Sequence, residues 1–361
     1  VVHTAPAIRA ALGECFGNPP GTLVTGRMVT ALRRLGFDKV FDTNFTADLT
    51  IVEEGTELLM RLKKVLVDHQ PAALPQFTSC SPGWINYAEH FLPDMLDNLS
   101  TCKSPQQMFG ALAKTFYARE AGVDPKDMVV VSVMPCTAKK FEAARPEMAS
   151  SGHRDVDYVL TTRELGRMID SAGIDFNTLP DSAMDSPLGL SSGAADIFAN
   201  TGGVMEAAIR TALKLVTGVN PPRADFEVTR GLKGVKEGVL EVAGKQVKIA
   251  VAHGLGNVEY VVNKVREAKQ KGEPPPWHFI EVMACPGGCV GGGGQPYGVT
   301  DELRLKRAKG LYQEDTAGLW RCSHDNPYVQ KLYADFLGKP LSEKSHHLLH
   351  THYTPRPLYQ R

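Results

Sequence analysis

The sequence lacks an excess of either charge and lacks any long apolar run. Its 40 Lys and Arg residues balance 40 Asp and Glu residues, so the charge does not point to nucleic acid or an anionic membrane as a partner. No apolar stretch approaches the roughly 18 residues that a membrane-spanning helix needs. We therefore expect no nucleic-acid binding and no membrane insertion.

Cysteine is scarce as well. The 361 residues include only seven cysteines, at positions 15, 80, 102, 136, 285, 289 and 322. An odd and widely spaced set in a long chain argues against a disulfide scaffold. Reduced thiols, some of them metal ligands, fit this pattern better.

The first residues, Val1-Val2-His3, include no initiator Met and no secretory signal. We interpret this start as cropped or processed, so the compartment cannot be derived from it. We expect a cytoplasmic protein, and leave the periplasm or an organelle open.

Apolar residues make up 43% of the chain, enough to bury a large core. Three β-rich apolar runs predict strands at 128–134, 247–253 and 278–283. Helices are predicted between such runs, at 104–120, 204–215 and 257–271. Ser104, Pro105 and Asn257 provide start signals, and Gly122, Gly218 and Gly272 provide stop signals.

This alternation predicts an α/β fold. No linker is apparent, so we treat 1–361 as one domain. The His- and Pro-rich tail from residue 346 onward is interpreted as an exposed or packed segment rather than a metal-binding tract.

Three segments combine cysteine with Pro or Gly: FTSCSPGW at 77–84, MPCTAKKFE at 134–142 and MACPGGCVGGGGQP at 283–296. Two of them directly follow predicted strands, so Cys136 and Cys285 should reach the crevice beyond the strand ends. The glycines would let the backbone approach a bulky cofactor, with amides directed at sulfide and thiolate. A flexible glycine loop with two buried thiols is the alternative. A zinc site is a weaker one, because no second close cysteine pair completes it.

These segments resemble, in the same order, the three signature motifs of iron–iron hydrogenases. The resemblance extends to 3–6, 41–57, 100–106, 201–207 and 350–353, which is nearly the whole chain. It implies two intertwined α/β lobes, each a mostly parallel sheet flanked by helices, with the cofactor in the cleft between them. The implied cofactor is an H-cluster. This is a 4Fe-4S cubane joined through one cysteine sulfur to a di-iron subsite that bears CO, CN and a bridging azadithiolate.

By motif position, the resemblance implies that Cys136, Cys285 and Cys289 are cubane ligands, with Cys289 shared with the di-iron subsite. The fourth position departs from the family, which has two adjacent cysteines where this chain has Cys80 and Ser81. Ser81 could ligate iron as an alkoxide, Cys80 could move onto the cubane, or the site could be open or engineered. We favour a retained cluster with Ser81 facing the open iron.

Cys102 is a remote candidate for the fourth ligand and is expected to be a buried core thiol. Cys15 and Cys322 match no motif and are expected to be structural.

The resemblance assigns the remaining site residues. Lys139 would donate to a cyanide. The implied cavity walls are Ala5, Pro6, Ser104, Pro105 and Gln106, and the implied apolar lining is Met134, Phe198 and Met283. Cys80, Glu54, Ser100 and Glu57 would relay protons. Glu54 and Glu57 are three residues apart and would share one helix face; without the resemblance they would be interpreted as an acidic helix surface.

The implied reaction is 2H⁺ + 2e⁻ ⇌ H₂, with electrons exchanged with ferredoxin or a similar carrier. Maturation proteins are implied partners, and oxygen should destroy the cofactor. The chain shows no N-terminal ferredoxin-like cysteine clusters. Two alternatives stay open: a slow hydrogen-sensing relative, against which Cys80 argues, and a non-enzymatic iron–sulfur assembly relative, against which Lys139 and the intact third motif argue.

Overall fold

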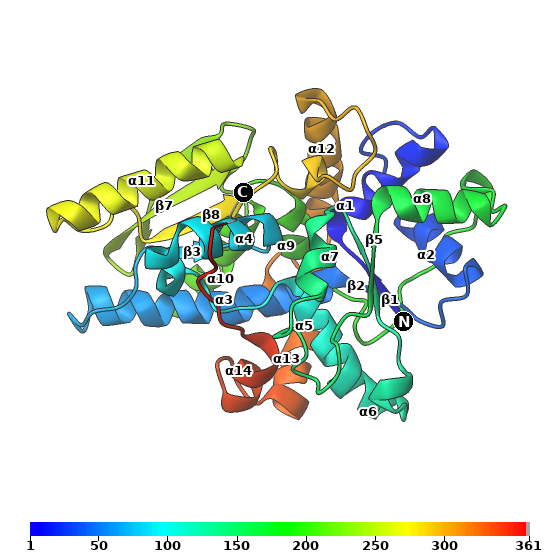
Figure 1. The fold of residues 1–361 in the computed structure, drawn as a ribbon, viewed down its shortest axis with the longest axis horizontal. Helices are drawn as coiled ribbons and strands as arrows, with labels where there is room; N and C mark the ends of the chain where they lie inside the picture. The colour runs from blue at the N-terminus through cyan, green and yellow to red at the C-terminus, as the bar shows by residue number, and fades with distance from the viewer. Residues whose placement is uncertain (359–361) are drawn as a thin grey trace.

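The computed structural model describes residues 1–358, and two four-stranded sheets organise them (Figure 1). The first sheet has the strand order β2-β1-β4-β5, and all its neighbouring strands are parallel. Its strands are β1 (Val2–Thr4), β2 (Val40–Asp42), β4 (Val131–Met134) and β5 (Tyr158–Thr161).

The second sheet has the order β3-β8-β7-β6, and only β6 runs antiparallel to its neighbour. Its strands are β3 (Gln76–Thr78), β6 (Val235–Val242), β7 (Lys245–His253) and β8 (Phe279–Met283). The chain begins in the first sheet with β1 and β2 and crosses to the second sheet for β3. It then returns to the first sheet for β4 and β5 and ends in the second sheet with β6, β7 and β8. The expectation of two intertwined, mostly parallel lobes is confirmed, and this crossing explains why the sequence shows no linker.

Helices flank both sheets. They are α1 (Pro6–Arg9), α2 (Thr25–Arg34), α3 (Thr43–Leu66), α4 (Pro82–Phe91), α5 (Pro105–Leu112), α6 (Ala118–Ala121), α7 (Ala138–Ala143), α8 (Thr162–Ser171), α9 (Gly193–Asp196), α10 (Gly203–Thr217), α11 (Leu255–Lys271), α12 (Asp301–Ala317), α13 (Pro327–Leu332) and α14 (Glu343–Leu349). No helix among the described residues is both long and apolar enough to cross a membrane.

The strand predictions are correct in place and wrong at some ends. The strand predicted at 128–134 begins at Val131, because its partner β1 begins at Val2, which pairs with Val131. The strand predicted at 247–253 begins two residues earlier, at Lys245, because the antiparallel partner β6 continues pairing as far as Val242.

Two helix-start signals are wrong in detail. Helix α11 begins at Leu255, and Gly254 with a φ of 78° occupies the cap position. Asn257 lies inside the helix, and its side-chain amide donates to the His253 carbonyl. Ser104 does precede α5, but its hydroxyl donates to Glu142 and leaves the helix uncapped. The predicted helix at 104–120 contains a π-helical stretch at 113–117, and Gly122 ends it in the left-handed conformation as expected.

Helix α3 connects the two lobes. Asp42, at the end of β2, caps it by accepting from the Asn44 amide. Its 24 residues extend about 36 Å at 1.5 Å per residue. It packs against α5 and α10 and runs along both sheets in Figure 1. A single rigid element therefore carries side chains from the first sheet toward the second.

The second sheet separates two apolar clusters. Phe279 and Met283 of β8 pack with residues of α3 and α10, while Ile280 and Val282 pack with α4 and α11. This period of two is what a strand buried on both faces requires. A third and larger cluster surrounds the first sheet.

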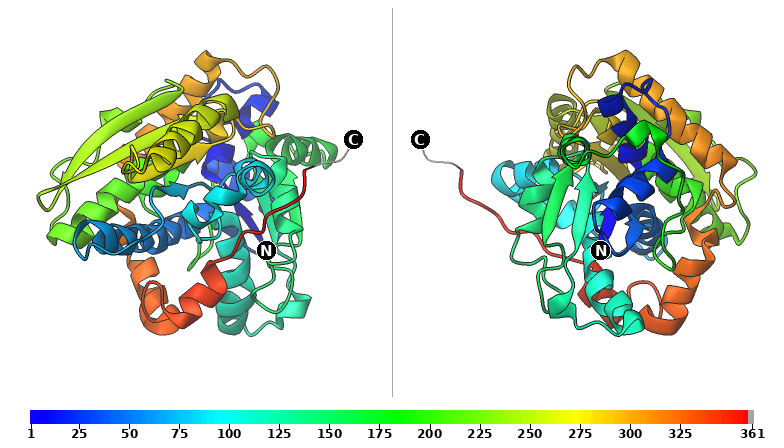
Figure 2. Two further views of the ribbon diagram at one scale, coloured as in Figure 1. Left: turned by 60° about the vertical axis from the view of Figure 1, so that its left-hand side comes forward. Right: turned by 90° about the vertical axis from the view of Figure 1, so that its right-hand side faces the viewer.

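The C-terminal segment packs against the protein at first, and its last described residues extend away from it in the right-hand view of Figure 2. Residues 343–349 form α14, so part of the predicted tail is helical. The Thr354 amide donates to the Glu89 carboxylate at 3.2 Å, and the Arg356 side chain donates to the same carboxylate at 2.7 Å. His350 is buried. The segment is therefore packed as far as His350 and mostly exposed beyond it in the described residues.

Candidate metal centre and proton path

The three cysteine segments follow the C-terminal ends of β3, β4 and β8. The loops after β4 and β8 touch through their backbones, because the Gly294 amide donates to the Pro135 carbonyl at 2.7 Å. A Cβ atom at Gly292 would overlap that carbonyl oxygen. Only glycine therefore permits this approach, which brings the Cys289 loop against the Cys136 loop.

Four thiols converge where these loops meet. Cys289 interacts electrostatically with Cys80, Cys136 and Cys285, and Cys136 interacts with Cys285. None of these cysteines is in a disulfide. Cys136, Cys285 and Cys289 were predicted to lie together, and the structure places them together, with Cys80 beside them.

Backbone amides surround the sulfur atoms. The Gly293 amide donates to Cys285, and the amides of Ala138 and Lys139, in the first turn of α7, donate to Cys136. Burial nevertheless raises the pKa of both thiols above the usual value. A bound cation would offset that burial cost, because it stabilises thiolates that are already supplied with donors.

Cys80 and Cys289 lie within hydrogen-bonding range of each other. This contact lowers the pKa of Cys80, and Lys139 acts in the same direction against the effect of burial. The same contact, followed by burial, raises the pKa of Cys289 well above the usual value. The two sulfur atoms therefore share one small region, with Lys139 as the nearby positive charge.

An apolar cavity of about 50 Å³ opens beside these thiols. Most of the expected wall residues line it: Ala5, Pro6, Pro105, Gln106, Met134, Lys139 and Phe198, together with Cys80, Cys136 and Cys289. Ser104 and Met283 do not line this cavity. Ser104 lines a neighbouring one, and Met283 is buried in the apolar cluster that also contains Phe198.

Thr43 and Ala47 also line the cavity, and the sequence analysis missed them. They lie on the first turns of α3, far in sequence from every cysteine segment. Nothing local in their sequence indicates a cofactor pocket, since the cap at Asp42 and the packing of α3 decide their position.

Lys139 is buried and paired. Its Nζ lies 2.9 Å from Glu142 Oε2 and 3.1 Å from Oε1, and Gln106 and Ser104 donate to the same carboxylate. Burial acts to lower the pKa of Lys139, but Glu142 and the Cys80 thiol raise it above the usual value. The cavity therefore has one fixed cation. Glu142 is three residues after Lys139, and that spacing was the available sequence signal.

Ser81 occupies the cap position of α4, and its amide is 3.0 Å from the Ser79 hydroxyl. Its own hydroxyl faces the region of Gly83 and Ala284, next to Cys285. Cys80, rather than Ser81, is on the wall of the apolar cavity.

The residues of the expected proton path lie near one another. Cys80 acts electrostatically on Glu54, and the Ser100 hydroxyl lies within hydrogen-bonding range of Glu54. The Ser100 hydroxyl donates to Glu57 Oε2 at 2.8 Å, and Glu57 Oε1 accepts from the half-buried Arg61 at 2.7 Å. The four expected relay residues are therefore brought into one region, in which Ser100 contacts both carboxyl groups and Cys80 lies close enough to Glu54 to affect its pKa.

Glu54 is the most perturbed carboxyl of this line. Burial raises its pKa to about 7, even though hydrogen bonds from Thr78 and Ser100 act to lower it. The Thr78 hydroxyl donates to Glu54 at 2.6 Å.

Arg61 and Thr78 were not predicted as neighbours of the relay carboxyl groups. Arg61 is four residues after Glu57 on the same helix face, which was a usable signal, whereas Thr78 meets Glu54 only through the packing of β3 on α3.

The remaining cysteines lie away from the thiol cluster. Cys102 is buried, as expected, and lies near Glu57. Cys322 is buried, and Cys15 is exposed.

Comparisons with known proteins agree with this geometry. Residues 1–293 match the family model described as the iron-only hydrogenase large subunit, C-terminal domain. Residues 301–356 match the model for the iron hydrogenase small subunit. Those two segments together span almost all of the described fold, from β1 to the packed C-terminal segment.

The NADP-reducing hydrogenase subunit HndD of Solidesulfovibrio fructosivorans is 57% identical to this chain over 357 residues. That alignment covers 99% of this chain and 60% of the relative. The chain is 54% identical over 82% of its length to the periplasmic [Fe] hydrogenase large subunit of Nitratidesulfovibrio vulgaris, and spans 68% of that protein. A cytosolic iron-sulfur assembly component 3 from Bos taurus is 35% identical over 98% of this chain and 74% of its own length.

A solved apo structure of the [FeFe]-hydrogenase HydA1 from Chlamydomonas reinhardtii has the same fold, with a TM-score of 0.84 and 42% identity. The match covers 99% of this chain and 94% of that one. From the family model, the shared identity and the shared fold, we conclude that this chain belongs to the iron-only hydrogenase family.

Proposed function

We propose that this chain interconverts protons, electrons and dihydrogen at an H-cluster: a 4Fe-4S cubane with a di-iron subsite that bears CO, CN and a bridging azadithiolate. One observation carries the proposal. Four converging thiols adjoin an apolar cavity with one buried cation, and a group of proton-carrying side chains lies near the same thiols. Such a cluster, when bound, supplies the redox chemistry of 2H⁺ + 2e⁻ ⇌ H₂.

The donor set fits this cofactor. Soft thiolates are the preferred ligands of iron–sulfur clusters. Cys136, Cys285 and Cys289 would hold the cubane, and Cys289 would also adjoin the cavity because it lies on its wall. Lys139 would donate to an anionic ligand in that cavity, since Glu142 holds its ammonium group in place. A charge-assisted hydrogen bond in a dry site is strong.

The relay residues move protons while they exclude bulk water. Glu57 receives a proton near Arg61, and Ser100 passes it inward by accepting one proton and releasing another. Glu54, with a pKa of about 7, holds a proton and releases it at neutral pH. Cys80 is the last group before the cavity. The relay residues thus position protons at fixed atoms. The surrounding apolar side chains keep those protons from exchanging with bulk water.

The fourth cubane ligand is tested by matched variants. We propose that Ser81 faces the open iron of a retained cluster. In that case Ser81→Cys should place a thiolate on the open iron and change the midpoint potential of the cubane, and Ser81→Ala should change its paramagnetic resonance spectrum because it removes the hydroxyl that faces that iron. If Ser81→Ala leaves that spectrum unchanged and Cys80→Ser alters it, Cys80 is the fourth ligand instead.

Infrared spectroscopy after insertion of the di-iron subsite tests the main proposal. Carbonyl and cyanide bands are expected for this chain and not for Cys289→Ala. Their absence from both proteins would favour the assembly-type alternative, represented by the relative from Bos taurus. Hydrogen evolution from reduced methyl viologen then separates a catalyst from a slow hydrogen sensor.

Partners and compartment follow from the family by analogy. We propose that electrons are exchanged with ferredoxin or a similar carrier and that maturation proteins install the di-iron subsite. Reduced ferredoxin should then support hydrogen evolution by the loaded chain, and a chain made without the maturation proteins should lack the subsite. We propose a cytoplasmic location, which fractionation of the source cells would test.

A further inference from the structure

A second group of metal-ligating side chains lies at the outer end of the proton path. Glu57, Cys102 and His350 are buried, and their ligand atoms lie within 4.8 Å of one another. Cys102 Sγ is 4.0 Å from Glu57 Oε2 and 3.9 Å from His350 Nδ1. Ligand atoms of a tetrahedral zinc ion are separated by about 3.5 Å. A small inward movement of these three groups would therefore complete a zinc-like arrangement.

The imidazole of His350 is already oriented for this role. Its Nε2 lies 3.1 Å from Glu53 Oε2, and its Nδ1 faces Cys102. Glu53 is fixed by the Tyr333 hydroxyl at 2.6 Å and the Leu341 amide at 2.9 Å. A carboxylate that accepts from one imidazole nitrogen directs the other toward a metal, and most zinc-binding histidines are held this way. Nδ1 of His350 would exchange its present contact with the Thr101 hydroxyl, at 2.7 Å, for the ion.

The electrostatic environment favours a cation. Burial, and then the charges of Glu57, Glu54 and Glu53, raise the pKa of the Cys102 thiol well above its usual value. Although burial opposes it, hydrogen bonding from His350 and other donors lowers the pKa of Glu53. The same negative potential that disfavours a lone thiolate would stabilise a divalent ion. Binding would form a Zn–S bond and release the thiol proton to solvent.

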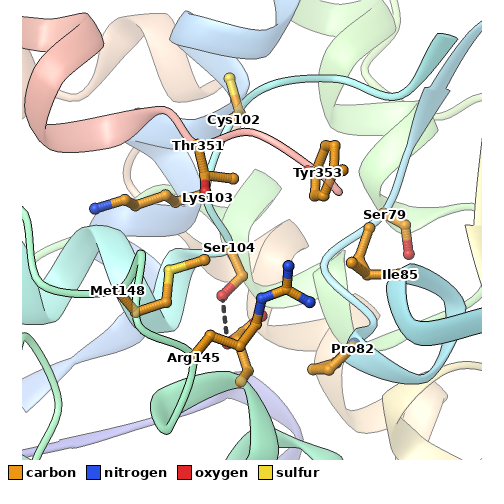
Figure 3. Close-up of a pocket in the computed structure, with 11 residues that line it drawn as sticks. Ser79, Pro82, Ile85, Cys102, Lys103, Ser104, Arg145, Met148, Thr351 and Tyr353 are labelled. Atoms are coloured by element: carbon orange, nitrogen blue, oxygen red, sulfur yellow. Dashed lines mark hydrogen bonds between the residues drawn. The ribbon is translucent and has the colours of Figure 1, made fainter. Parts of the chain in front are cut away.

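Of the three groups, Cys102 also lines a narrow cavity of about 20 Å³, and Ser104 and Tyr353 are among the other lining residues. Figure 3 shows Cys102 at one end of the lining, with Thr351 and Tyr353 beside it. Thr351 and Tyr353 are half-buried, so the cavity meets solvent near them.

We propose that Glu57, Cys102 and His350 form a binding site for Zn²⁺, with the Thr101 hydroxyl or a water as the fourth ligand, and that zinc there stops proton transfer. The Thr101 hydroxyl is 2.7 Å from His350 Nδ1 and 3.4 Å from Glu57 Oε1. A mixed thiolate, imidazole and carboxylate set is typical of zinc. Inhibition follows because the ion removes the Glu57 carboxylate from the relay. That second half of the proposal rests on the proposed function.

The test uses the cluster-loaded chain and zinc salt alone. Zinc X-ray absorption reports only the zinc ligands, even beside iron. All measurements are made in a chain that carries Cys322→Ser. This substitution removes one ligand from Cys322, His324 and Asp325, another group of side chains that could bind zinc. One sulfur at about 2.3 Å and lighter ligands at about 2.0 Å are expected. Adding Cys102→Ser should remove the sulfur scatterer and weaken zinc binding, measured by calorimetry, by roughly 100-fold or more.

His350→Gln and Glu53→Gln provide independent variants if Cys102→Ser folds poorly. Glu53→Gln acts through His350 and should weaken zinc binding by roughly 10- to 100-fold. An unchanged sulfur signal, or equally tight binding, in Cys102→Ser overturns the site. Hydrogen evolution is then measured with and without zinc for each variant. Zinc that binds through Cys102 but leaves hydrogen evolution unaffected supports the site and overturns the role of Glu57 in proton transfer.

Discussion

Replacing Glu54 by Gln should remove a specific part of the pH dependence of stability. Glu54 is buried on α3, and the cost of burying its charged form raises its pKa from 4.5 to about 7. Gln keeps nearly the same shape and the hydrogen-bonding oxygen but cannot ionise. Any difference in pH dependence between the two proteins therefore reports the ionisation of this one carboxyl group.

The magnitude follows from the two pKa values. A group whose pKa is raised on folding adds stability below its unfolded pKa and loses that contribution as the pH rises through its folded pKa. A difference of about 2.5 pH units, at about 1.4 kcal/mol per unit, corresponds to about 3 kcal/mol. About 2 kcal/mol of this should be lost between pH 5.5 and pH 8. The natural chain should lose that stability, and Glu54→Gln should not.

Urea denaturation of the iron-free chain, followed by tryptophan fluorescence, measures this difference across the same pH range. Other titrating groups cancel because both proteins contain them. If the difference in unfolding free energy between the two proteins does not change with pH, Glu54 titrates at its ordinary value, and the buried-acid explanation of the relay is refuted.

Three further outcomes test the packing and the path. Arg210→Met removes the guanidinium that binds the buried carboxylates of both Glu206 and Asp315, which keep Arg230 and Arg321 as partners; it should lower unfolding free energy by about 2 kcal/mol, and a loss below about 0.5 kcal/mol would contradict this. Gly203→Ala places a Cβ against a backbone carbonyl and should cost about 3 kcal/mol, seen as a lower urea midpoint; an unchanged midpoint would show that the backbone relaxes. Ser100→Ala removes the hydroxyl between two relay carboxyls and should reduce hydrogen evolution roughly 10²- to 10⁴-fold, with iron content as the control. Undiminished evolution would remove Ser100 from the path.

The sequence by itself determined the chemistry of the centre. Cys136, Cys285 and Cys289 are named by their motifs, because cofactor contacts depend on residue type and on local spacing. Strands were also indicated near 128–134, 247–253 and 278–283, because apolar β-rich runs bury themselves, although their ends differ by up to three residues from the observed strands.

Only the tertiary structure decided how distant segments meet. Thr43 and Ala47 line the cofactor cavity because α3 is capped at Asp42 and packed between the lobes. His350 reaches Cys102 because the C-terminal segment folds back over the protein. Strand ends and helix starts, such as Val131 and Leu255, depended on partner strands and on backbone conformation. Local patterns fix residue types and periodicity, whereas contacts between distant segments depend on the summed packing of the whole chain.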